Sequence, residues 1–128
     1  MKRAIRVAHM TIRISGLLLL LLGIAIWTGR ADGVIPVHKL LGFVLVLSLW
    51  TLSYLASRAG VPMKWVGLAV AWGLVAPILG LAQEGLLTGN WHWTIQVIHL
   101  LIGVGAIAMG ENLARRIQEA APAKVGVA

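Results

Sequence analysis

The sequence predicts an all-α integral membrane protein, a four-helix up-down-up-down bundle with both termini in the cytoplasm. Three observations predict this fold class. Of the 128 residues, 59% are hydrophobic and 12% are charged, whereas a soluble domain has about 45–50% apolar and about 25% charged residues. The apolar residues gather in four runs long enough to cross a bilayer. The basic residues gather at the ends of these runs.

Four spans account for nearly the whole chain, and the lipid bilayer is their expected surrounding. The spans cover about residues 8–28, 35–57, 64–82 and 92–112. The breaks between them contain Gly, Pro, Asn and Asp, which favour turns. The bundle therefore takes up residues 1–117, and 118–128 is predicted to be a short flexible tail. A basic start before Leu17–Leu22 also fits a secretory signal, but no small-x-small cleavage site follows Trp27, so we expect a true span.

Lys and Arg are distributed asymmetrically between the two ends of the predicted helices. With the N-terminus inside, only Arg30 and Lys39 lie on the outer side. The nine inner residues are Lys2, Arg3, Arg6, Arg13, Arg58, Lys64, Arg115, Arg116 and Lys124. Because cytoplasmic segments carry the excess of basic residues, we predict a multi-pass protein of the inner (cytoplasmic) membrane. The net charge of +7 is thereby explained by topology, and nucleic acid is not an expected partner.

Tryptophan and glycine positions add detail to the predicted bundle. Tryptophans favour membrane interfaces, and on this assignment Trp27, Trp91 and Trp93 mark the outer interface and Trp65 the inner one. Trp50 and Trp72 lie deeper. Glycines recur seven residues apart, which places each pair on one helix face. The pairs are Gly16 and Gly23, Gly73 and Gly80, and Gly103 and Gly110. Such faces allow either close helix packing or contact with a flat cofactor.

Histidines are the main candidates for chemistry. The chain contains no cysteine, which excludes disulfides, iron–sulfur clusters, thiolate zinc sites and thioether-attached haem. Ionisable groups inside a membrane are costly, so each one is a functional candidate. The four histidines are His9, His38, His92 and His99. Glu84 and Glu111 lie near the ends of spans, where we expect them to be solvated.

Two of these histidines share a local pattern. His38 begins the run HKLLG and His99 begins HLLIG, so Gly42 and Gly103 each lie one helical turn after a histidine on the same face. A porphyrin needs both features, an imidazole to reach the iron and a flat helix surface beside it. The second and fourth helices run in the same direction and form a diagonal pair of the bundle. The pattern therefore predicts a haem iron ligated by His38 and His99.

Other residues near the predicted site have two interpretations each. His92 is an alternative ligand, and it is also expected as an interfacial side chain, a partner of a haem propionate or part of a quinone site. Arg30 and Lys39 could pair with propionates or anchor the interface. His99 could instead be a core histidine bonded to a backbone carbonyl, Gln96 or Ser48. A metal ion without a porphyrin is disfavoured, because no carboxylate or third histidine lies at the same depth.

His9 lies at the opposite leaflet from the other three histidines. A second haem there would need a partner such as Met63 or Met109. We expect instead an interfacial histidine whose ring extends toward the polar region among neighbouring arginines.

The second span resembles bacterial cytochromes of the cytochrome b561 type. The resemblance rests on IPVHKLLGFVLVLSLW (35–50), because the second helix of that family commonly opens with His-Lys-x-x-Gly. A histidine near the start of the first helix, here His9, and a histidine-bearing fourth helix also fit the pattern of the family. It implies a four-helix membrane protein that binds haem b through two histidines and passes electrons between quinones and partner proteins, and some members oxidise superoxide. His92 and His99 are closer together than the fourth-helix histidines of two-haem members, so the resemblance implies one haem, near the outer leaflet.

Three functions are consistent with these patterns. The first is a haem-b electron carrier that exchanges electrons with quinol at the outer face and with a redox partner protein, either as a simple carrier or as an enzyme. The second is a small four-helix transporter subunit, although no carboxylate lies in the middle of a span. The third is a cofactor-free assembly subunit of a larger membrane complex, packed through its glycine faces.

Overall fold

The computed structural model describes residues 1–121 and consists of helices only over that range. The four long helices are α1 (Lys2–Trp27), α2 (Ile35–Arg58), α3 (Met63–Ala82) and α4 (His92–Ala120). Three single-turn 3₁₀ helices occupy the connections, η1 (Asp32–Val34), η2 (Gln83–Gly85) and η3 (Gly89–Trp91). Each long helix is apolar enough and long enough to cross a membrane. The predicted all-helical architecture, with four helices long and apolar enough to span a membrane, is therefore confirmed over residues 1–121.

The helix ends follow from local sequence. Gly29 and Gly60 follow the ends of α1 and α2 with φ values of +69° and +85°, a conformation that glycine adopts without steric cost. At the end of α2 the amide of Val61 donates to Ala56 O (3.1 Å) and the amide of Gly60 to Ser57 O (3.3 Å), which is the Schellman pattern. The amides of Gly29 and Arg30 make the equivalent bonds at the end of α1. Both helices thus stop where their glycine allows the chain to turn.

Helix α4 extends past the predicted end of the bundle at residue 117. Helix α4 continues to Ala120, so residues 118–120, predicted as part of the tail, are helical. Ala121 follows the helix, and 122–128 lie outside the described residues.

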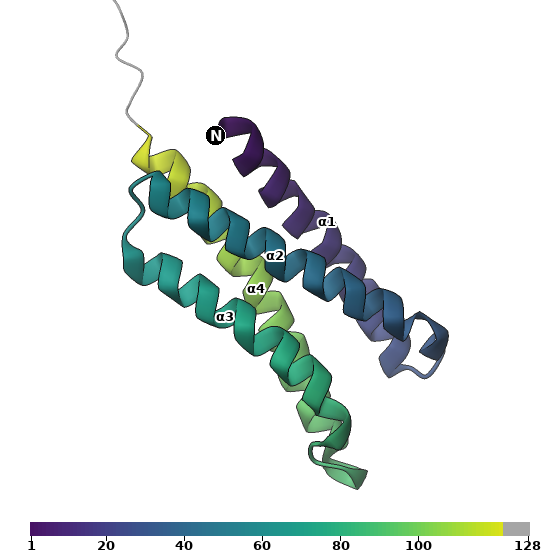
Figure 1. Cartoon of the computed structure of the whole chain (residues 1–128). Coiled ribbons are helices and arrows are strands. Elements are labelled where there is room, and N and C mark those ends of the chain that lie inside the picture. The colour runs from purple at the N-terminus through teal and green to yellow at the C-terminus, as the bar shows by residue number, and fades with distance from the viewer. Residues whose placement is uncertain (122–128) are drawn as a thin grey trace, which may run out of the picture.

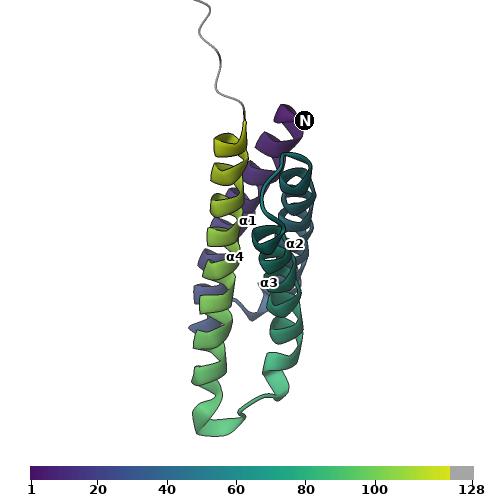
Figure 2. The same ribbon diagram turned by 90° about the vertical axis from the view of Figure 1, so that its left-hand side faces the viewer.

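The helices pack as a four-membered ring with one diagonal contact. Each helix contacts its neighbours in the chain, α1 also contacts α4, and α2 contacts α4 across the bundle. Within residues 1–121, α1 and α3 do not contact each other. The start of α1 and the end of α4 lie at one end of the bundle, here called the terminal end (Figures 1 and 2). The α1–α2 and α3–α4 connections lie at the other end, the cavity end.

The hydrophobic core fills the terminal half of the bundle. Ile12, Leu49, Leu52 and Leu113 are its largest fully buried apolar side chains, and they come from the first part of α1 and the second parts of α2 and α4. Many large apolar side chains on the outside are exposed, among them Leu21, Leu47 and Leu101. An apolar exterior of this kind suits contact with lipid. Helix packing is therefore tight at one end of the molecule and open at the other.

Three of the paired glycines accommodate large side chains in this tight half. A methyl group at Gly16 would meet Ile107, one at Gly73 would meet Trp50 and one at Gly110 would meet Ile12, all at 2.6–2.9 Å. Gly105, which is not in a pair, receives the indole of Trp72 in the same way. These glycines therefore make room for a side chain of another helix.

A polar cluster links α1 and α4 in the terminal half. Arg13 donates from Nε to Glu111 Oε1 (2.6 Å) and from Nη2 to Oε2 (3.0 Å). His9 Nε2 lies 2.9 Å from the same Oε1. A paired, two-pronged Arg–carboxylate contact is strong and directional. Glu111, expected to be solvated, thus holds together the two helices that close the ring.

Candidate cofactor site

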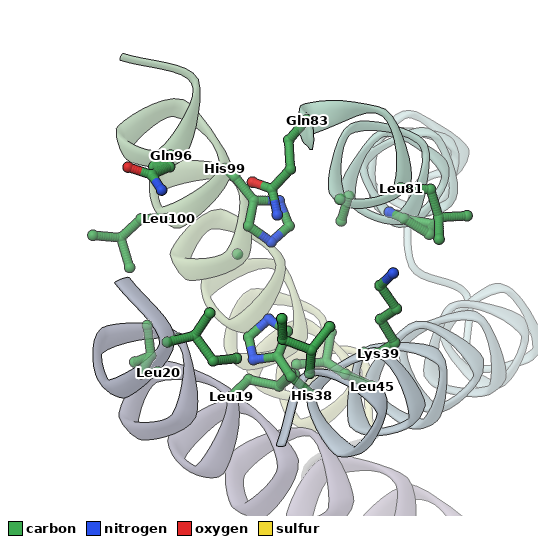
Figure 3. A pocket seen from close by; sticks show the side chains of 18 of the residues that line it. Leu19, Leu20, His38, Lys39, Leu45, Leu81, Gln83, Gln96, His99 and Leu100 are labelled. Carbon is green, nitrogen blue, oxygen red and sulfur yellow. The ribbon is translucent and has the colours of Figure 1, made fainter. Parts of the chain in front are cut away.

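A cavity of about 400 Å³ occupies the cavity end of the bundle, and all four long helices line it (Figure 3). Its volume falls within the roughly 300–1,000 Å³ of typical cofactor sites. The walls are mainly apolar, with Leu19, Leu20, Leu45, Leu81 and Leu100 among them. A few polar side chains interrupt this lining, which is the composition expected of a site that holds a largely apolar, oriented ligand.

His38 and His99 face each other across this cavity. His38 lies one turn into α2, and His99 lies about two turns into α4. Their ring centroids are 6.3 Å apart and the ring planes are inclined by 54°. Figure 3 shows the two rings pointing toward each other from their helices. The pairing of these two histidines, predicted from their shared sequence pattern, is thus present in the fold.

The two imidazoles have an unusual environment for buried polar groups. Nδ1 of His38 and Nδ1 of His99 are both buried and have no hydrogen-bond partner. Buried polar atoms are nearly always hydrogen-bonded, and each exception calls for an explanation. Neither Gln96 nor Ser48 bonds to His99, in contrast to the alternative considered from the sequence. A bound group that supplies partners or charge would account for two such rings in one apolar cavity.

Glycines of the neighbouring helices support both rings. A methyl group at Gly80 of α3 would lie 3.0 Å from Cε1 of His99, and one at Gly23 of α1 would lie 3.3 Å from Cε1 of His38. Each imidazole therefore packs closely on a helix that does not carry it. Sequence reasoning identified both glycines as members of spaced pairs but not as supports of the histidines, because the contacts join different helices.

Gly42 and Gly103 line the cavity, one turn after the two histidines. A methyl group at either position would meet nothing within 4 Å. The open space beside them belongs to the cavity, in contrast to the filled space at Gly73 or Gly110. The flat surfaces predicted beside the histidines are therefore present and are not used for helix packing.

The remaining predicted site residues are placed differently. His92 lines the cavity, with Nδ1 at 3.2 Å from Leu86 O. Lys39 also lines it, and its Nζ lies 3.8 Å from Glu84 Oε1. Arg30 is exposed and is not part of the lining. Of the two basic residues predicted to pair with propionates, only Lys39 therefore lines the cavity, and Lys39 already lies beside the carboxylate of Glu84.

The sequence did not predict that four further polar residues line the cavity, although Glu84 was expected to be solvated and Gln96 was considered as a partner of His99. Asp32, Gln83, Glu84 and Gln96 contribute to the cavity wall. Three of them belong to the short connections η1 and η2, whose direction no helical periodicity predicts.

His9 is remote from the cavity and already contacts Glu111. Met63, one proposed partner, is exposed, and Met109 packs against the hydrophobic core. Over residues 1–121 no group of three or more His, Asp or Glu side chains is arranged to hold a metal ion. Among the described residues, the facing pair His38 and His99 therefore has no third His, Asp or Glu placed to share a metal ion with it.

Comparison of the chain with known protein families, with curated proteins and with solved structures found no match. Function is therefore inferred from the cavity itself.

Proposed function

We propose that this chain is a membrane electron-transfer protein that binds one haem b, with His38 and His99 as the axial ligands. The observation that carries this proposal is the facing pair of imidazoles in an apolar cavity, 6.3 Å apart between ring centroids. Two imidazoles on opposite sides of one metal ion, each with a nitrogen about 2 Å from it, have centroids about 6 Å apart. The separation of the two rings is consistent with this arrangement.

The ligand set favours a haem over a bare ion. Protein zinc sites use three or four protein ligands, and within residues 1–121 no third such side chain is grouped with the facing pair of histidines. Calcium and magnesium prefer oxygen ligands, whereas the atoms that face each other here are imidazole nitrogens. An iron porphyrin brings four nitrogens of its own and needs only axial ligands from the protein. The open surfaces at Gly42 and Gly103 leave room for the macrocycle beside each histidine.

The proposed topology is up-down-up-down, with both termini in the cytoplasm and the protein in the inner membrane. Nine basic residues of the sequence belong to the inner side and two to the outer side on this assignment, in agreement with the positive-inside rule. The cavity would then lie near the outer face. The contact of α2 with α4 across the bundle supports only the diagonal placement of the two helices that carry the proposed ligands.

Each group of residues in the cavity has a proposed role in electron transfer. When bound, haem b supplies a one-electron iron couple. His38 and His99 would hold the iron from opposite sides, and the leucines of the cavity wall would exclude water. Quinol is the proposed electron donor, because a lipid-soluble reductant can approach through the membrane. Lys39 and His92 would donate hydrogen bonds to the propionates, and Glu84 would accept a hydrogen bond from quinol.

Absorption spectra of the purified protein test the proposal. After expression with a haem precursor and purification in mild detergent, the dithionite-reduced protein should show sharp α and β bands. His38→Ala and His99→Ala should each abolish these bands, because either change removes one axial ligand. His92→Ala is the matched control: the residue type, the helix and the cavity are the same as for His99, but Nδ1 of His92 already lies 3.2 Å from Leu86 O.

Two results would contradict the proposal. A colourless wild-type protein would exclude haem, and the transporter and assembly functions would then become the leading hypotheses. Bands that survive in both the His38→Ala and His99→Ala proteins would show that the haem binds elsewhere.

A further inference from the structure

Two cations share one indole ring at the terminal end of the bundle. The guanidinium carbon of Arg116 lies 3.8 Å from the ring centroid of Trp65, and Nζ of Lys64 lies 5.7 Å from it. Arg116 belongs to the last turns of α4, and Lys64 and Trp65 belong to the first turn of α3. The ring faces of tryptophan attract cations, so Trp65 gathers two positive charges from different helices into one small region.

Arg116 is held in place by a second contact. Its Nε donates to Oδ1 of Asn112, one turn earlier on α4, at 2.6 Å. The planar guanidinium is therefore fixed by stacking on one face and by a hydrogen bond along one edge. Its terminal amino groups make no hydrogen bond within residues 1–121. A guanidinium presents its donors in a rigid fork that matches phosphate and carboxylate oxygens, and here part of that fork is free.

No acidic side chain within residues 1–121 compensates these two charges. Arg13 is paired with Glu111, and Arg115 contacts Glu119 at 3.8 Å. Neither Lys64 nor Arg116 has such a partner among the described residues. Two like charges beside one ring repel each other, so an external anion would stabilise the arrangement.

We propose that Arg116, Lys64 and Trp65 form a binding site for the phosphate of an anionic phospholipid headgroup. The site lies at the ends of apolar helices, which is where lipid headgroups meet a membrane protein. Met63 and Leu68 are exposed apolar side chains of α3, one residue before and four residues after Lys64. They offer contact for the acyl chains of the lipid. A soluble phosphate would use the same donors but would gain nothing from these apolar neighbours. The site is at the opposite end from the cavity and does not depend on haem.

The test compares two arginines that are adjacent in the sequence. Arg115→Gln and Arg116→Gln remove the same charge from the same turn of α4, but only Arg116 is stacked on Trp65. Native mass spectrometry of the detergent-purified protein, incubated with equal amounts of dioleoyl phosphatidylglycerol and dioleoyl phosphatidylcholine, measures which lipid is retained. Wild-type protein should retain phosphatidylglycerol preferentially. Arg116→Gln should lower that retention about tenfold, because it removes a charged hydrogen-bond donor to the phosphate. Arg115→Gln should leave the retention nearly unchanged, because Arg115 contacts Glu119 and is not held on Trp65.

A further variant separates binding from folding. Asn112→Ala keeps every charge but frees the guanidinium of Arg116, so it should weaken retention of phosphatidylglycerol with no change in helix content. Equal losses in the Arg115→Gln and Arg116→Gln proteins would show general electrostatic attraction and overturn the proposed site. No preference for phosphatidylglycerol in the wild type would also overturn it. Displacement of the lipid by inorganic phosphate at an equal concentration would show that the apolar neighbours add nothing to binding, and it would overturn the assignment to lipid.

Discussion

Replacing Gly42 or Gly103 with leucine is expected to abolish haem binding and to leave the helical bundle folded. Neither glycine has a neighbour within 4 Å of the position that a methyl group would take, so the new side chain meets no protein atom at that point. It enters the cavity instead. A leucine side chain one turn from the ligand occupies space that the macrocycle requires. Leucine also favours helix over glycine by roughly 1 kcal/mol, so the protein without cofactor should not lose stability.

Gly67→Leu is the matched control for this experiment. Gly67 is also a helical glycine with nothing within 4 Å, but it is exposed and does not line the cavity. The haem content per protein, measured from the reduced α band after purification, should fall close to zero in both cavity variants and remain at the wild-type value in Gly67→Leu. Full haem content in Gly42→Leu and Gly103→Leu would place the cofactor outside this cavity, even if both histidines proved necessary.

The part of the site that the sequence could predict is the part carried by single helices. His38 with Gly42, and His99 with Gly103, are pairs within one helix, and helical periodicity places both members on one face. The supports of the two rings, Gly23 and Gly80, come from other helices. Their roles depend on helix rotation and register, which a sequence without related sequences does not specify.

The fold shows the same division between local and long-range information. Apolar runs predicted all four helices, because length and composition alone distinguish a membrane-spanning segment. The helices extend beyond the predicted spans, as at Lys2 and Ala120, because polar helical turns continue outside the apolar region. The contact of Arg13 with Glu111 joins residues that are 98 positions apart. A pattern of residues within one helix does not predict a contact between residues so far apart in the sequence.

Replacing Gly105 or Gly73 with alanine is expected to destabilise the bundle, although alanine normally stabilises a helix relative to glycine. A methyl group at Gly105 would lie 2.6 Å from Cζ2 of Trp72, and one at Gly73 would lie 2.6 Å from Nε1 of Trp50. Neither indole can move freely, because Trp72 donates to Ile102 O (2.9 Å) and Trp50 to Val70 O (3.2 Å). Overpacking costs about 1–3 kcal/mol, and loss of a hydrogen bond adds about 1 kcal/mol. Together these exceed the roughly 1 kcal/mol gained in helix propensity.

Reversible unfolding in mixed micelles, followed by circular dichroism, measures the sign of this balance. Gly67→Ala is the control, because it supplies the gain in helix propensity at a glycine that has open space around it. Gly67→Ala should raise the free energy of unfolding or leave it unchanged. Gly105→Ala should lower the free energy of unfolding. Trp72→Phe removes the part of the indole that the new methyl group would strike, so Gly105→Ala should cost less in the Trp72→Phe background than in the wild type. Such coupling is the mark of residues in direct contact. If the two changes proved additive, the indole of Trp72 could not be what requires a glycine at position 105.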